Sequence, residues 1–234
     1  MPSPDALAVA LWRLLALALA PVTPARLEEV AALAEALAEI PDAPKGAAEL
    51  LEAAGRTTAD TVAACQARLF AMTPRVSPYE GGYEDDPFRQ ARQMADVAGF
   101  YRAFGAESQG PAHEKVDHAG CELEFLSFLG ARRLEGVTEE ERDLLESAEN
   151  AFLSDHAGRW LPSFFRALER EAEDGFHRAL GSLGAAAVAA ELDRRGIVPE
   201  AAPARARRLE VEADALECGG DSMSRILTRQ SSRR

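Results

Sequence analysis

The stretch HEKVDHAGCELEF, residues 113–125, holds residue types that could carry a proton, a metal ion or a cationic ligand. Asp117 and His118 stand next to each other, and Glu122 follows His118 by four residues. Side chains four residues apart share one face of a helix, so His118 and Glu122 could pair there. An imidazole beside a carboxylate can change its charge near neutral pH. We expect a helix to start here, with Asp117 as its N-cap and His118 and Glu122 forming a binding surface.

The pattern disfavours a metal site and a catalytic centre. Asp117, His118 and Glu122 could supply three ligands, but H-x-x-x-E alone is a weak metal signature, and His113 lies off the helical spacing. The sequence contains no GxSxG, HExxH, phosphate-binding loop or GxGxxG. The histidines occur without a companion set that would define a reaction. We therefore expect no catalytic residues, no metal and no cofactor.

A second Asp-His pair, Asp155 and His156, precedes Trp160 and Pro162. Two such pairs near helix junctions are more than the composition requires. We count His156 and Trp160 among the candidate binding residues.

The loop TPRVSPYEGGYEDDPF, residues 73–88, is rich in prolines, glycines and acids, so it cannot be a helix interior. It nevertheless contains Tyr79 and Tyr83, two of the three tyrosines, on either side of Glu80. Polar loops that carry aromatic residues are often functional. Docking of the loop onto the protein's own core is the alternative interpretation.

The elements that must position these residues are helices. The sequence is 47% hydrophobic but only 6% aromatic, and it is dominated by alanine and leucine, which are strong helix formers. We predict an all-α fold of about ten helices. They cover 7–19, 24–40, 46–54, 58–72, 87–104, 118–133, 138–154, a fresh helix permitted by Pro162, 182–195 and 203–217. Tyr101 and Phe104 lie near the end of the helix that Gly105 stops.

The breakers also predict the domain organisation. A single compact helical domain spans 1–217, with halves at about 1–105 and 114–217 and a hinge at 106–113 around Gly110 and Pro111. Residues 218–234 form a flexible tail that ends in Arg233 and Arg234. A hinge between two halves is compatible with either a monomer or a swapped dimer.

The charge restricts the partners. The sequence has 26 Lys and Arg against 39 Asp and Glu, a formal net charge of −13. Such a surface repels phosphate backbones and anionic lipids, so neither nucleic acid nor a membrane is expected as a partner, whereas a cationic one is favoured. Three cysteines without a CxxC pair indicate neither a disulfide framework nor structural zinc. The first residues lack a basic n-region and contain Arg13, so we expect a cytoplasmic protein.

Four segments in order resemble one family. VDHAGCELEF is similar to the D-H-x-x-x-E-L-x-F segment of the TorD/DmsD/NarJ-type chaperones, the all-helical assembly factors of molybdoenzymes. DVAGFYRAFGAE and SDHAGRWLPSFFRAL resemble the helix before that segment and a later H-x-x-x-W-x-P-x-F segment. SPYEGGY looks like the loop of a subgroup that serves dimethyl sulfide and ethylbenzene dehydrogenases and selenate and chlorate reductases. Val116 in place of a common proline, and Gly81-Gly82 in the loop, depart from the pattern.

The resemblance implies a non-enzymatic chaperone. It would bind the apo catalytic subunit of a molybdopterin oxidoreductase through its twin-arginine signal peptide, aid cofactor insertion and delay export. An acidic protein with an apolar groove complements such a peptide. The alternatives are a helical adaptor with another partner, or a small helical hydrolase or nucleotide-binding protein. The candidate client-binding residues are Asp117, His118, Glu122, Tyr79, Glu80, Tyr83, Tyr101, Phe104, His156 and Trp160.

Overall fold

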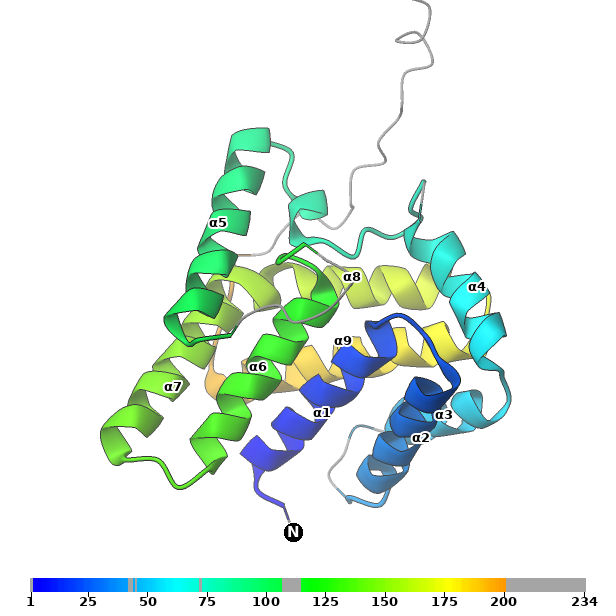
Figure 1. The fold of residues 1–234 in the computed structure, drawn as a ribbon, viewed down its shortest axis with the longest axis horizontal. Coiled ribbons are helices and arrows are strands. Elements are labelled where there is room, and N and C mark those ends of the chain that lie inside the picture. The colour runs from blue at the N-terminus through cyan, green and yellow to red at the C-terminus, as the bar shows by residue number, and fades with distance from the viewer. Residues whose placement is uncertain (1, 42–43, 45, 72, 107–114, 201–234) are drawn as a thin grey trace, which may run out of the picture.

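The structure is a computed structural model that describes residues 2–41, 44, 46–71, 73–106 and 115–200. The described residues form an all-α domain, as predicted, and their one β feature is an isolated bridge between Tyr79 and His118. The helices are α1 (Pro4–Leu19), α2 (Pro24–Ala38), α3 (Gly46–Gly55), α4 (Ala59–Phe70), α5 (Pro87–Ala103), α6 (Ala119–Leu134), α7 (Glu139–Phe152), α8 (Gly158–Glu171) and α9 (Gly175–Arg195), with a 3-10 turn η1 (Glu80–Tyr83) and a π-helical turn η2 (Leu153–Ala157) (Figure 1).

Side chains at the N-termini fix where several helices begin. Thr58 and Thr138 cap α4 and α7 by accepting bonds from the backbone N–H groups three residues later. Ser3, Thr23 and Asp174 do the same for α1, α2 and α9. Each bond satisfies an N–H group that the helix itself cannot pair.

Two predicted boundaries are wrong. Pro162 does not open a helix but lies inside α8, which continues from α7 through the π turn η2 without a break. Pro162 has no backbone N–H for the Gly158 carbonyl, so this bond is missing from the helix one turn after the π turn η2. The last described helix starts at Gly175 rather than Ser182, since Asp174 caps it.

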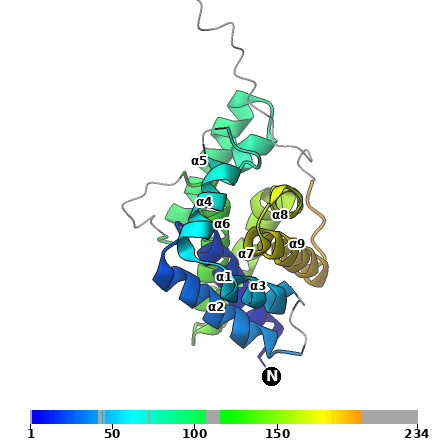
Figure 2. The same ribbon diagram turned by 90° about the vertical axis from the view of Figure 1, so that its right-hand side faces the viewer.

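The core lies where α1, α6, α8 and α9 pack against one another. Helix α1 packs against α6 and α9, α8 packs along α9, and α3 packs on α2 and α9. Figure 1 shows α1 and α6 side by side in front of α8 and α9, and Figure 2 shows the same layers from the side. Leu14, Leu123, Phe164 and Leu180, one from each of four helices, are fully buried in one apolar cluster. This cluster holds the start of α6 and the π turn against the loop before α5.

The predicted helix 203–217, the tail 218–234 and nearly all of the hinge 106–113 lie outside the described residues. The division into halves at that hinge therefore stays a prediction. No helix in the described part of the chain combines the length and the hydropathy that a membrane crossing would need.

Candidate functional site

The segment Ser77–Tyr83 is docked against the start of α6. Its backbone bonds that of α6 at two points: Glu80 N–H donates to the Asp117 carbonyl at 2.9 Å, and Ala119 N–H donates to the Pro78 carbonyl at 2.8 Å. The Tyr83 hydroxyl donates back to the Ser77 carbonyl at 3.3 Å. Docking on the protein's own core, one of the two interpretations of the loop, is therefore what the structure contains.

The roles of Asp117 and His118 differ from the prediction. His118, not Asp117, is the N-cap of α6, because its Nδ1 accepts from the Gly120 N–H at 3.0 Å. Asp117 turns instead toward the docked segment, where its Oδ2 accepts from the Gly81 N–H at 3.1 Å. The prediction that Asp117 caps the helix is wrong, since the segment supplies an N–H donor from 36 residues away in sequence. Asp117 thus holds the segment Ser77–Tyr83 by a hydrogen bond, and His118 caps α6.

Glu122 is completely buried one turn into α6. Its Oε2 accepts from the Trp160 indole N–H at 2.9 Å, so its carboxylate is held by α8 rather than by the expected pairing with His118. Burial, and next the charge of Glu80, raise the pKa of Glu122 well above its ordinary value, although the indole bond opposes the rise. The surroundings therefore favour the neutral form of Glu122.

His156 meets Glu80 from the opposite side. Its Nδ1 lies 3.3 and 3.2 Å from the two Glu80 carboxylate oxygens, and both side chains are buried. The π turn η2 carries His156, and such turns often occur at functional sites. Asp96, which is exposed, places a carboxylate oxygen 3.4 Å from His156 Nε2 without forming an aligned hydrogen bond.

Aromatic rings surround these polar groups. Tyr83 packs against Trp160 with tilted rings whose centres are 5.3 Å apart, and Tyr79 meets His118 edge-on at 5.4 Å. The Tyr101 hydroxyl donates to the Val116 carbonyl at 2.9 Å, and burial raises the pKa of Tyr101 well above its ordinary value.

Phe104, at the end of α5, joins the same aromatic cluster. Its ring centre lies 6.2 Å from that of Phe125, which in turn packs against Tyr101. The polar groups of the site are therefore bounded on the α5 side by apolar rings.

Three buried polar atoms in this cluster have no hydrogen-bond partner among the described residues: Asp117 Oδ1, Glu122 Oε1 and His156 Nε2. Buried polar atoms are normally paired, so these three require an account in terms of strain, a bound water or a ligand. The described residues include no set of three His, Cys, Asp or Glu side chains arranged to hold a metal ion. The two oxygen atoms could instead accept hydrogen bonds from an incoming cationic donor.

The sequence profile described as nitrate reductase delta subunit matches residues 24–166. The chain belongs to this family. The matched range contains all ten candidate residues, and eight of them are buried around the start of α6, while Tyr79 and Phe104 are half-buried.

Two curated relatives match part of the chain. One is "Chaperone protein TorD" of Photobacterium profundum, 26% identical over 114 residues, which are 47% of this chain and 53% of the relative. The other is "Perchlorate reductase assembly chaperone protein" of Dechloromonas aromatica, 31% identical over 90 residues, which are 38% of this chain and 40% of the relative. The chain thus spans about half the length of the first relative and less than half the length of the second. Their names describe chaperones and not catalysts, and they support the TorD/NarJ family resemblance, while the subgroup stays a prediction.

Sequence reasoning did not find some of the residues that contact the candidate site residues of this chain. Gly81 gives the N–H that holds Asp117, and Phe152 packs on His156 with ring centres 5.3 Å apart. The glycine pair in SPYEGGY was a usable signal, because glycine permits another group to approach the backbone closely. In the structure, a Cβ at Gly81 would lie 3.2 Å from Asp117 Oδ2. The position of Phe152 carried no signal apart from its helical spacing.

Proposed function

We propose that this member of the nitrate reductase delta subunit family is a chaperone that acts in the cytoplasm. It binds the apo catalytic subunit of a molybdopterin oxidoreductase through the twin-arginine signal peptide, aids insertion of the cofactor and delays export. The binding site is the buried cluster where the segment Ser77–Tyr83 meets α6 and the π turn. The family match and the names of the two relatives support this proposal.

One observation carries the proposal: three buried carboxyl groups, Glu80, Asp117 and Glu122, share a site with two buried histidines and no lysine or arginine that pairs with them among the described residues. Asp117 and Glu122 each keep one oxygen without a partner among the described residues. A guanidinium carries five N–H donors in a planar fork and binds carboxylates with charge-assisted bonds. An arginine of the client would satisfy both oxygens and compensate the negative charge.

Access requires the docked segment to move. Glu122 is fully buried, so a client side chain reaches it only after the segment Ser77–Tyr83 lifts from α6. This movement breaks the backbone bonds at Glu80 and Ala119, the Asp117–Gly81 bond and the Glu80–His156 contact. Each of these hydrogen bonds contributes about 1 kcal/mol net, which binding of a charged peptide can offset.

The first test is a tagged pull-down from the native host, grown under conditions that induce molybdoenzymes and analysed by mass spectrometry. We expect recovery of one molybdopterin-type catalytic subunit. A parallel strain carries Arg→Lys changes in the signal peptide of that subunit, and we expect recovery to fall there, because a lysine cannot form the bidentate bond. Failure to recover such a subunit, with its expression verified, would contradict the proposal and favour an adaptor or another activity.

Calorimetry with the synthetic signal peptide of the recovered subunit then tests the site. Glu122→Gln should weaken binding by about tenfold to a hundredfold, because an amide, unlike the carboxyl group, cannot ionise to become the anionic partner of the arginine. Glu124→Gln is the matched control, since Glu124 lies on the same helix, is exposed and pairs only with Arg13 among the described residues. Equal affinities of the two variants would place the peptide elsewhere on the protein.

A further inference from the structure

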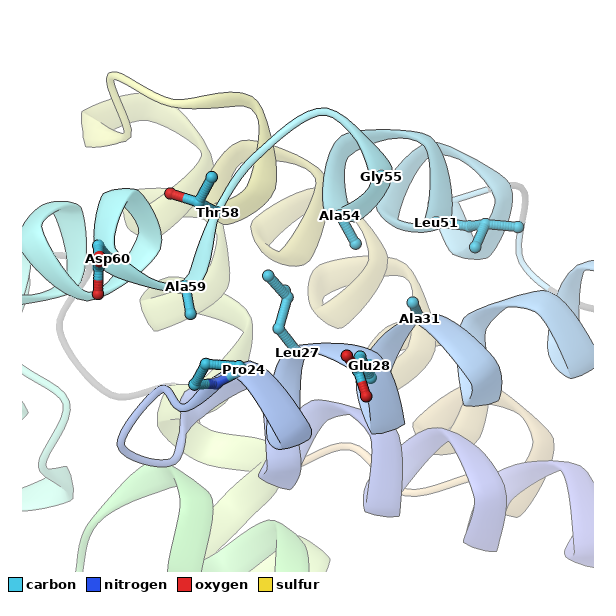
Figure 3. A pocket seen from close by; sticks show the side chains of 10 residues that line it. All are labelled: Pro24, Leu27, Glu28, Ala31, Leu51, Ala54, Gly55, Thr58, Ala59 and Asp60. Atoms are coloured by element: carbon cyan, nitrogen blue, oxygen red, sulfur yellow. The ribbon is translucent and has the colours of Figure 1, made fainter.

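An apolar groove lies far from the candidate site, between α2, α3 and α4. Its volume is about 400 Å³, and Leu27, Ala31, Leu51 and Ala54 form its apolar lining. Figure 3 shows Leu27 in the middle of this groove, with helices α2 and α3 on either side. A pocket of this size is in the range that accepts a few side chains of a peptide or a small ligand.

The rim of the groove carries two acidic side chains that form no ion pair with the described residues. Glu28 of α2 and Asp60 of α4 line it, both are exposed, and neither has an ion-pair partner among the described residues. The lining includes no lysine or arginine. The chemistry of the groove therefore fits an occupant with apolar side chains next to cationic ones.

We propose that the occupant is the chain's own segment Ser222–Gln230, SMSRILTRQ. Met223, Ile226 and Leu227 have the spacing of one apolar helical face, and Arg225 and Arg229 lie on the other side of such a helix. Long arginine side chains can reach past the apolar face to the acidic rim. Residues 218–234 contain four arginines against one aspartate, the reverse of the acidic balance of the whole chain.

The segment can reach the groove. The last described residue, Glu200, is held at the start of α8, where its carbonyl accepts from Arg159 Nε at 3.1 Å. The groove lies at the other end of α9, because α3 packs on α9 and Ala53 of α3 is next to Gly175. Helix α9 is about 32 Å long at 1.5 Å per residue, whereas residues 201–221 can span up to roughly 70 Å when extended. A tethered segment also acts at a high effective concentration, so weak contacts suffice.

The test follows the methyl NMR signals of Leu27 and Leu51 in the full chain. Leu227→Asp places a charge in the apolar face, and we expect the signals of both leucines to shift. Leu216→Asp is the matched control, with the same change outside the proposed segment, and should leave them in place. Unchanged Leu27 and Leu51 signals in Leu227→Asp would overturn the proposal.

A peptide of residues 221–234 added to the Leu227→Asp chain should bind and return the two leucine signals toward their original positions. Changing Glu28 and Asp60 to lysine in the same chain should weaken that binding by about tenfold or more, as expected when attraction becomes repulsion. The original chain and Leu227→Asp are also compared at decreasing protein concentration. If the difference in their leucine signals vanishes on dilution, docking within one molecule is contradicted, and the groove is occupied by the tail of a second copy. The proposal does not depend on the proposed chaperone function.

Discussion

Glu122 makes the stability of the fold depend on pH. Burial and the neighbouring charge of Glu80 raise its pKa in the folded protein, while in the unfolded chain it keeps its ordinary value near 4.5. Below that value both states are protonated, and Glu122 costs the fold nothing. As the pH rises from about 4.5 toward the folded pKa, only the unfolded state ionises freely, so stability is lost.

Glu122→Gln should remove this loss. The amide keeps a carbonyl oxygen to accept from the Trp160 indole, but it cannot ionise. We expect both proteins to have similar free energies of unfolding near pH 4 and the variant to be more stable at pH 7, by about 1.4 kcal/mol for each unit of the pKa rise. Urea unfolding at both pH values measures it, with exposed Glu124→Gln as the control. A stability difference that stays constant with pH would show that Glu122 has the same pKa in the folded protein as in the unfolded chain.

Part of the candidate site could be predicted at the residue scale. The spacing D-H-x-x-x-E correctly indicated the start of a helix, and His118, Glu122 and Trp160 all belong to one buried cluster. The observed roles could not be predicted: His118 is the N-cap of α6, and Asp117 accepts a hydrogen bond from the docked segment. They depend on Gly81, which reaches Asp117 only through tertiary packing. Local propensity does not contain such a contact.

At the scale of elements, small residues set how closely α8 and α9 approach. A Cβ at Gly181 of α9 would lie 2.8 Å from the Phe165 carbonyl oxygen and closer still to the Glu169 backbone nitrogen. Backbone atoms of α8 cannot move aside as a side-chain end can. The contact therefore requires glycine at this position, and the two helices can bury Leu168 and Leu180 completely.

Gly181→Ala should destabilise the protein by about 1–3 kcal/mol or more, the usual effect of overpacking in a core. Gly99→Ala is the opposite control, because a Cβ at Gly99 of α5 meets nothing within 4 Å. There alanine should stabilise the helix by about 0.5–1 kcal/mol. Denaturant unfolding of both variants measures the two effects. If Gly181→Ala were as stable as the original chain, α8 and α9 would have to lie further apart than in the structure.

The same helices show where sequence prediction of elements ends. Helical periodicity and caps located α1 to α4 within a few residues, because their ends depend on local residues such as Thr23 and Thr58. The continuous run from α7 to α8 could not be predicted from a sequence with Pro162 in it. A Cβ at Gly158 would collide with the Leu153 carbonyl across the π turn, so this turn relies on a close backbone approach that no propensity scale records.

At the scale of the whole molecule, an ionic network joins the ends of four helices on the side away from the apolar groove. Arg133, at the end of α6, donates to Glu149 of α7 at 3.1 Å and to Asp5 of α1 at 2.9 Å. Arg195, at the end of α9, pairs with the same Glu149 and with Glu191. The hydrogen bond that Arg133 donates to Asp5 favours the charged guanidinium and raises its pKa further. No single pattern in the sequence predicts this network, since its members lie up to 190 residues apart.

Arg133→Ala should therefore destabilise the whole domain rather than one helix. The Glu149 carboxylate, which is 3% exposed, would lose one of its two arginine partners, and truncation of a buried pair typically costs about 3–5 kcal/mol. Arg132→Ala, at the adjacent position, removes a partly exposed pair with Glu141 and a guanidinium contact with the Phe128 ring, and should cost about 1 kcal/mol, less than Arg133→Ala. Thermal unfolding followed by circular dichroism compares the two variants. Because the buried pair is little screened by salt, the effect of Arg133→Ala should persist at about 0.5 M NaCl, whereas equal melting temperatures for both variants would contradict a structural role of the network.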